Sequence, residues 1–240
     1  MSDRIMKLFN ISVILTALAS TILALPKVEV RVSDEMVQAG NVDLFASTWE
    51  AIYAESGNQE AVTIDKTLPG QLKRCHQELD TEINVRVYIE GAWGDAGGVN
   101  HNNRDALVQA AWKAINEISA KDAYDIFTGC CFTDPIQPSC SVPLNSVCDQ
   151  DSCGCQGGQH AVCSTRTVGH QVPSHINAYI YDDNNNLLSD HLLITFSSAS
   201  TEPSGGCGIV GTLTSEFAGF AFPGVLGTLF QKGIELGCGA

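Results

Sequence analysis

The clearest pattern of apolar and polar positions lies in residues 82–90, where the two kinds of side chain alternate (Glu-Ile-Asn-Val-Arg-Val-Tyr-Ile-Glu). A period of two is typical of a strand with one buried face. The alternation recurs in residues 174–181, and another apolar run follows in residues 187–197. Between these runs, the Asp- and Asn-rich residues 182–186 are typical of a turn, so the pair predicts a hairpin. A further short strand over residues 163–168 gives a sheet of three or four strands.

A helical pattern of apolar residues follows the predicted strand at residues 82–90. Its apolar positions recur every three or four residues, at Leu107, Ala110, Ala111, Ala114, Ile115 and Ile118. This spacing predicts an amphipathic helix that is capped by Asn102 or Asn103 and ends between 119 and 124. The glycine-rich residues 91–98 before it lack the Gly-Lys-Ser/Thr ending of a phosphate-binding loop, so no nucleotide site is predicted.

The C-terminal residues 209–230 are apolar, and Glu216 is the single charged residue among them. Pro223 interrupts any helix at this point, so the pattern favours a buried hairpin of two short helices. The alternative is a membrane-active segment. Its candidate residues are Phe217, Phe220, Phe222, Leu226 and Phe230. A permanent transmembrane helix is not expected, because the uninterrupted apolar stretch is short and holds a proline.

These elements together predict an α+β fold. The expected form is a small disulfide-rich α/β sandwich, in which two helical segments cover one face of an antiparallel sheet of three to four strands. Residues 75–240, which contain all of these elements, are of ordinary size for one domain.

The N-terminal residues 1–24 have the three parts of a secretory signal peptide. Arg4 and Lys7 give a positive start, an apolar run follows, and small residues end the segment. The apolar run is too short to cross a hydrocarbon layer of about 30 Å comfortably, which disfavours the alternative of a membrane anchor. Secretion to the extracellular space is therefore predicted.

Lys73 and Arg74 form the only pair of adjacent basic residues, and they separate a cysteine-free stretch from a cysteine-rich one. Such a step resembles the sites that kexin- and furin-type proteases cut in the secretory pathway. The sequence therefore predicts a signal peptide (1–24), a pro-segment (25–74) and a mature domain (75–240). The alternative is that residues 25–74 stay attached, because they carry a strand pattern and a helix pattern of their own.

All ten cysteines lie in the predicted mature domain: Cys75, Cys130, Cys131, Cys140, Cys148, Cys153, Cys155, Cys163, Cys207 and Cys238. Behind a signal peptide, such a number implies disulfides, and the spacing does not fix their pairing. Cys207 and Cys238 flank the apolar C-terminal run, so a disulfide between them would join its two ends. Zinc is the alternative, with Cys148, Cys153, Cys155, Cys163 and His160 as ligands. The sequence lacks a clean pair of Cys-x-x-Cys knuckles, so no metal or other cofactor is predicted.

Acidic side chains outnumber basic ones, and the formal net charge is −14. Phosphate binding needs a basic face, so nucleic acid is not expected as a partner. Simple attraction to anionic lipid is disfavoured for the same reason.

Catalytic motifs are absent: the sequence holds neither Gly-x-Ser-x-Gly nor His-Glu-x-x-His. Two weaker sets keep a secreted hydrolase as an alternative. One is an acid–base trio of His170, His175 and either Asp182 or Asp183. The other is a carboxylate pair for sugar hydrolysis, Glu90 and Asp95. No catalytic residue is assigned, and an enzyme is disfavoured.

The layout of signal peptide, cysteine-free segment, Lys73-Arg74 step and small glycine-rich, disulfide-dense α/β domain resembles fungal preprotoxins and secreted effectors. Yeast and smut killer toxins are the nearest group. Their small α/β-sandwich folds suit the order of strand 82–90, helix 103–119 and hairpin 174–197. The resemblance covers most of the chain but is one of architecture, and it transfers no catalytic or binding residue.

The resemblance implies a secreted, disulfide-stabilised toxin or effector that acts by target binding or by membrane disturbance. Its expected partners are the processing protease and a cell-surface or membrane target. A secreted hydrolase and a non-toxic extracellular structural protein are the alternatives. Only one dibasic step is present, so a toxin that is cut into two subunits is not expected.

Overall fold

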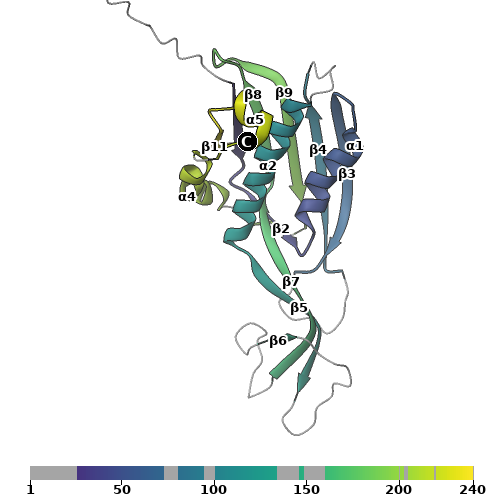
Figure 1. Ribbon diagram of the computed structural model, residues 1–240. Coiled ribbons are helices and arrows are strands. Elements are labelled where there is room, and N and C mark those ends of the chain that lie inside the picture. The colour runs from purple at the N-terminus through teal and green to yellow at the C-terminus, as the bar shows by residue number, and fades with distance from the viewer. Residues whose placement is uncertain are drawn as a thin grey trace, which may run out of the picture.

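The computed structural model describes residues 26–72, 81–94, 101–133, 146–148, 160–199, 201–202, 205–218 and 220–239. Within them, the larger sheet has six strands in the order β11-β1-β8-β9-β4-β3 (Figure 1). Its strands are β1 (Lys27–Val32), β3 (Ala61–Gly70), β4 (Ile83–Ala92), β8 (His175–Tyr181), β9 (Leu187–Ser197) and β11 (Ile234–Cys238). All neighbours are antiparallel except β1 and β11, which are parallel.

The second sheet has five strands in all. They are β2 (Met36–Gly40), β5 (Tyr124–Thr133), β6 (Ser146–Cys148), β7 (His160–Pro173) and β10 (Thr201–Glu202). The two sheets share a bend where β1 leads to β2 and β7 leads to β8. At this bend Ser33 N donates to the His175 carbonyl at 3.0 Å, and Ser174 N donates to the Glu35 carbonyl at 2.8 Å. Both β7 and β5 extend beyond the helix-covered body, and β6 pairs with β7 in this extension (Figure 1).

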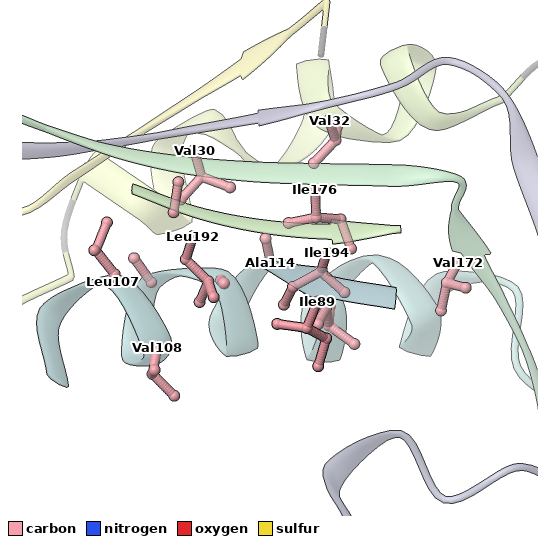
Figure 2. Close-up of a cluster of buried hydrophobic side chains, with 14 of the residues drawn as sticks. Val30, Val32, Ile89, Leu107, Val108, Ala114, Val172, Ile176, Leu192 and Ile194 are labelled. Atoms are coloured by element: carbon pink, nitrogen blue, oxygen red, sulfur yellow. The ribbon is translucent and has the colours of Figure 1, made fainter. Parts of the chain in front are cut away.

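The core lies between the six-stranded sheet and the helices on one of its faces. The helices are η1 (Ala46–Glu50, a π-helical turn), α1 (Ala51–Ser56), α2 (Asn102–Lys121), α4 (Gly206–Ala218) and α5 (Gly224–Leu229). Figure 2 shows the apolar side chains of α2 beneath strand residues such as Ile176, Leu192 and Ile194. Each large aliphatic side chain that is fully buried here contributes about 1.5–3 kcal/mol to stability.

The strand and helix predictions are confirmed in place and type. The predicted strand 82–90 is β4, and the predicted hairpin is formed by β8 and β9. In the turn between them, the Asp182 carboxylate accepts the backbone N–H groups of Asn184 at 2.9 Å and Asn186 at 2.7 Å. The predicted short strand 163–168 lies inside the longer β7.

The predicted cap of α2 is wrong in detail. Asn102 and Asn103 are the first helical residues, and His101 occupies the cap without a side-chain hydrogen bond. Asn103 instead donates to the buried Asp190 carboxylate at 3.1 Å, which ties the start of α2 to β9. A tertiary partner therefore replaces the local capping interaction that the sequence suggests.

The mixed α+β class is confirmed, but the predicted size of the sheet is wrong. Six strands form the larger sheet, because residues 26–72 supply β1 and β3 to it and the C-terminal residues supply β11. Residues 26–72 also supply β2 to the other sheet, and the predicted strand 163–168, as part of β7, belongs to that other sheet as well. Strand β1 lies between β11 and β8, and its Val28, Val30 and Val32 side chains are completely buried. The predicted pro-segment thus shares one core with residues 81–239. Cleavage at Lys73-Arg74, which lie outside the described residues, stays a prediction.

Two of the predicted disulfides are present. Cys130 pairs with Cys163 across β5 and β7, and Cys207 pairs with Cys238 to join α4 to β11. The predicted disulfide between Cys207 and Cys238, which joins the two ends of the C-terminal run, is confirmed. The two bridges span sequence separations of 33 and 31 residues, and closing loops of this length stabilises a fold by about 3–4 kcal/mol in the chain-entropy account. The side chains of the other six cysteines lie outside what the structure describes.

The C-terminal run forms α4 and α5 on either side of Pro223. Of the predicted membrane-active side chains, Phe217, Phe222, Leu226 and Phe230 are buried, and Phe220 is half-buried. Membrane insertion would require the buried four to leave the core. Among the described residues, no helix is both long enough and apolar enough to span a bilayer.

Candidate functional site

A groove of about 660 Å³ lies between α2, η1 and the segment that leads into α5. Its volume falls within the usual range for small-ligand sites, about 300–1,000 Å³. The lining residues are Trp49, Gln109, Trp112, Lys113, Asn116, Glu117, Phe220, Ala221 and Pro223. Aromatic rings and polar side chains therefore meet in one concave surface.

Helix α2 supplies most of this lining from the side turned away from the sheet. Gln109, Trp112, Lys113 and Asn116 follow the spacing i, i+3, i+4 and i+7, so they share one helical face. The buried stripe of the same helix lies on the opposite face, because its positions are offset by about half a turn. The groove therefore has a rigid floor, since α2 is fixed to the sheet from below.

A row of aromatic rings at η1 and α1, called here the aromatic wall, lies beside the groove, and Trp49 of this row lines the groove together with Trp112 of α2. The Phe45 and Trp49 ring centroids are 5.9 Å apart in a stacked arrangement, and Trp112 meets Phe45 edge-on at 5.0 Å. Tyr53 extends the row, with its ring centroid 5.4 Å from that of Trp49. Aromatic pairs of this kind add about 0.5–1.5 kcal/mol beyond the area that they bury. The wall is thus preorganised, although its rings remain partly exposed.

The Tyr53 end of this wall is anchored to the first turn of α2. The Tyr53 hydroxyl donates to the Asp105 carboxylate at 3.1 Å. Arg104 lies over the Tyr53 ring at 4.8 Å and donates to the Gly57 carbonyl at 2.7 Å. Burial, and then the nearby Asp105 carboxylate, raise the pKa of Tyr53 above its ordinary value, so the phenol stays protonated and keeps donating.

Among the described residues, Lys113 and Glu117 are the only charged ones in the groove lining. The Lys113 ammonium donates to the Glu117 carboxylate at 3.1 Å, and it also lies 5.6 Å from the Phe220 ring centroid. The two charges offset each other. The groove is therefore electrically neutral within a protein that carries a net charge of −14.

The predicted acid–base trio is not assembled. His170 belongs to β7, and its Nδ1 lies 3.3 Å from the Ser119 carbonyl. His175 belongs to β8 and is hydrogen-bonded to the Ser174 hydroxyl at 2.9 Å. Asp182 follows the far end of β8, roughly 23 Å from His175 for seven residues of extended chain. The structure thus places these side chains at separate positions.

The other candidate sets also fall outside the groove. Glu90 lies on the open face of the sheet, where it accepts the Tyr88 hydroxyl at 3.2 Å, and Asp95 lies outside the described residues. Of the candidate zinc ligands, Cys163 is engaged in a disulfide. The side chains of the remaining candidates are not among those described.

A second, smaller cavity of about 320 Å³ lies near the β8–β9 turn and α5. Its polar lining includes Asp182, whose carboxylate already accepts hydrogen bonds from Asn184 and Asn186. Those hydrogen bonds lower the pKa of the Asp182 carboxyl group, with the Asn186 bonds contributing most. This cavity differs from the groove in being smaller and in having no aromatic lining residue except Phe230.

Comparisons with protein-family models, with curated proteins and with solved structures gave no match. The fold and the groove define a disulfide-linked α+β protein with an aromatic-lined surface groove. Sequence reasoning missed this site. A signal was present, because Trp112 falls on the polar face of an amphipathic helix, where a large aromatic ring is buried less than on the apolar face.

Proposed function

We propose that this protein is a secreted, disulfide-stabilised effector of the toxin type that acts by binding a target on a cell surface. The aromatic groove is its contact site. The architectural similarity to killer toxins and fungal effectors supports this class, as does the disulfide content, which is typical of oxidising compartments. Maturation by a kexin- or furin-type protease at Lys73-Arg74 belongs to the same proposal.

The observation that carries the proposal is the half-exposed state of the groove aromatics. Trp93 is completely buried, and its indole N–H donates to the Gln59 carbonyl at 2.6 Å. Trp49 and Trp112, in contrast, stay partly exposed, and within the described residues neither indole N–H has a protein acceptor. Leaving large rings in water forfeits burial energy, and binding surfaces concentrate tryptophan and tyrosine for this reason.

Target binding is favoured over membrane disturbance as the mode of action. Most of the predicted membrane-active side chains lie in the core, whereas the groove presents rings and polar groups without rearrangement. A preformed site pays little ordering cost on association.

The test compares the binding of labelled secreted protein to intact target cells for wild type, Trp112→Ala and Tyr88→Ala. Tyr88 is a matched control, because it is a partly exposed aromatic residue on the open face of the sheet. We expect Trp112→Ala to weaken binding by about tenfold or more, as for the truncation of an interface hot spot. Because Trp112 also packs against Phe45, its loss should lower the thermal stability modestly, so binding is compared at a temperature where both proteins are folded. Equal binding by wild type and Trp112→Ala would refute the role of the groove.

The alternatives predict other results. A secreted hydrolase predicts turnover of wall or protein substrates that disappears in His170→Ala or in Glu90→Gln. A non-toxic structural protein predicts neither turnover nor specific binding, and no growth inhibition of any target cell.

A further inference from the structure

We propose that the groove recognises a neutral oligosaccharide. This inference rests on the proposed target-binding function and names the chemistry of the target. It follows from three properties of the lining: its ring surfaces, its free hydrogen-bonding groups and its balanced charge.

The ring surfaces suit a pyranose. A sugar ring has flat faces of C–H groups, and these faces pack on aromatic rings, while its hydroxyls project from the edge. Trp49 and Trp112 line the groove from η1 and α2, and Phe220 lines it from the segment before α5. Three aromatic side chains from three elements therefore surround a volume that a short oligosaccharide fills better than a monosaccharide does.

The polar lining suits hydroxyl groups. Gln109 and Asn116 each offer an amide N–H₂ donor and a carbonyl acceptor. Among the described residues, neither of these side-chain amides has a hydrogen-bond partner, so both are available to a ligand. A hydroxyl both donates and accepts, and it can therefore satisfy either end of an amide.

The same groups argue against a proline-rich peptide, the other ligand that aromatic-lined grooves commonly take. An extended proline-rich segment offers carbonyl acceptors but few N–H donors, because proline lacks the backbone N–H. The amide oxygens of Gln109 and Asn116 would then face acceptors. Burying such groups without donors costs about 1–3 kcal/mol each.

The charge balance points to a neutral ligand. Lys113 and Glu117 are paired at 3.1 Å, and they are the only charges in the lining. An anionic ligand would have to compete with Glu117 for the ammonium group and would also approach a protein of net charge −14. A cationic ligand would compete with Lys113 in the same way.

The experiment titrates the full secreted protein with neutral oligomers of glucose, mannose and N-acetylglucosamine, and follows tryptophan fluorescence. Two of the three tryptophans line the groove, and the third, Trp93, is completely buried as an internal reference. We expect saturable binding of at least one oligomer. Affinity should fall by roughly 10- to 30-fold in Trp112→Ala and by a smaller factor in Gln109→Ala and Asn116→Ala. Tyr88→Ala should bind like wild type, and thermal unfolding of every variant is measured in parallel.

The probes for the other ligand classes are an oligogalacturonate, which is anionic, and a proline decamer. Saturation by either one in preference to all neutral oligomers would overturn the inference, as would Trp112→Ala retaining full oligosaccharide affinity. If no neutral oligomer binds while cell binding still depends on Trp112, the oligosaccharide inference fails and the proposed function survives. If cell binding does not depend on Trp112 either, both fail.

Discussion

Tyr53 links the aromatic wall of the groove to the first turn of α2. Its hydroxyl donates to Asp105, and its ring lies beneath the Arg104 guanidinium group, which is itself largely buried. This arrangement fixes the rotamers of a row that continues through Trp49 to Phe45. The shape of the groove thus depends on a polar contact that no ligand touches directly.

The raised pKa of Tyr53 makes this contact sensitive to alkaline pH. In the unfolded chain a tyrosine ionises near pH 10, whereas in the folded protein Tyr53 ionises at higher pH. The stabilisation is therefore complete below about pH 10 and is lost as the pH rises toward the folded pKa. We expect Tyr53→Phe to cost about 1–2 kcal/mol at neutral pH, because it removes a hydrogen bond to a carboxylate.

The measurement is urea unfolding of wild type and Tyr53→Phe from about pH 8 to about pH 11. The difference in the free energy of unfolding between the two proteins should be constant up to about pH 10 and should shrink above it. A difference that stays constant across the whole range would show that the pKa of Tyr53 is not raised in the folded protein.

Trp112 and its helix show which features of the site can be predicted from the sequence alone. The apolar stripe of α2 is correctly predicted, because sequence spacing alone determines which side chains share a helical face. The groove is not predictable in the same way. It needs Trp49 and Phe220 beside Trp112, and these residues meet only through tertiary packing. For the same reason, the spacing of His170, His175 and Asp182 in the sequence says nothing reliable about their distance in the fold.

At the scale of elements, the position of β1 has the largest consequence. Local patterns predict β4, α2 and the β8–β9 hairpin well, because each is built from neighbouring residues. Whether a strand near residue 30 lies at the centre of the sheet or outside it depends on pairing with residues about 150 and 200 positions away, namely those of β8 and β11. The cysteine boundary near residue 75 suggests a detachable segment, whereas the pairing of β1 joins that segment to the rest of the fold.

This pairing leads to a prediction for processing. If the chain is cut after Lys73-Arg74, we expect residues 26–72 to remain bound as a non-covalent chain. Strand β3 pairs with β4 over ten residue positions, from Ala61 with Ala92 to Gly70 with Ile83. The Leu72 N–H also donates to the Glu82 carboxylate at 2.8 Å, which holds together the two sides of the cut.

Treatment of the purified, uncut protein with a kexin-type protease tests this expectation. Denaturing gels should separate two chains with or without a reducing agent, because residues 25–74 contain no cysteine. Size-exclusion chromatography under native conditions should leave them together. As a control, Lys73→Ala/Arg74→Ala should stay a single chain in both assays. A fragment 75–240 that elutes alone and keeps a cooperative unfolding transition would contradict the prediction, and would show that β1 is dispensable.

At the scale of the whole molecule, the net negative charge of the protein contrasts with the electrical neutrality of its groove. The chain carries a net charge of −14, yet its groove holds one compensated ion pair. The helices cover one face of the six-stranded sheet, and the groove lies on this covered side (Figure 1). The proposed recognition through stacking and neutral hydrogen bonds would therefore take place on a protein whose long-range field repels anionic partners.

This contrast between an acidic protein and a neutral groove predicts how target binding depends on salt. Raising the salt concentration from about 50 to about 500 mM shortens the Debye length from more than 10 Å to less than 5 Å. Ionic contacts to a target would weaken steeply over this range. Groove-mediated binding should change by less than about threefold, and any change should be a gain, because salt screens the repulsion between an acidic protein and an anionic cell surface. The measurement is the affinity of labelled protein for intact target cells at several salt concentrations, with Trp112→Ala as the background. A loss of binding of about tenfold or more at high salt would indicate that ion pairs outside the groove carry the interaction.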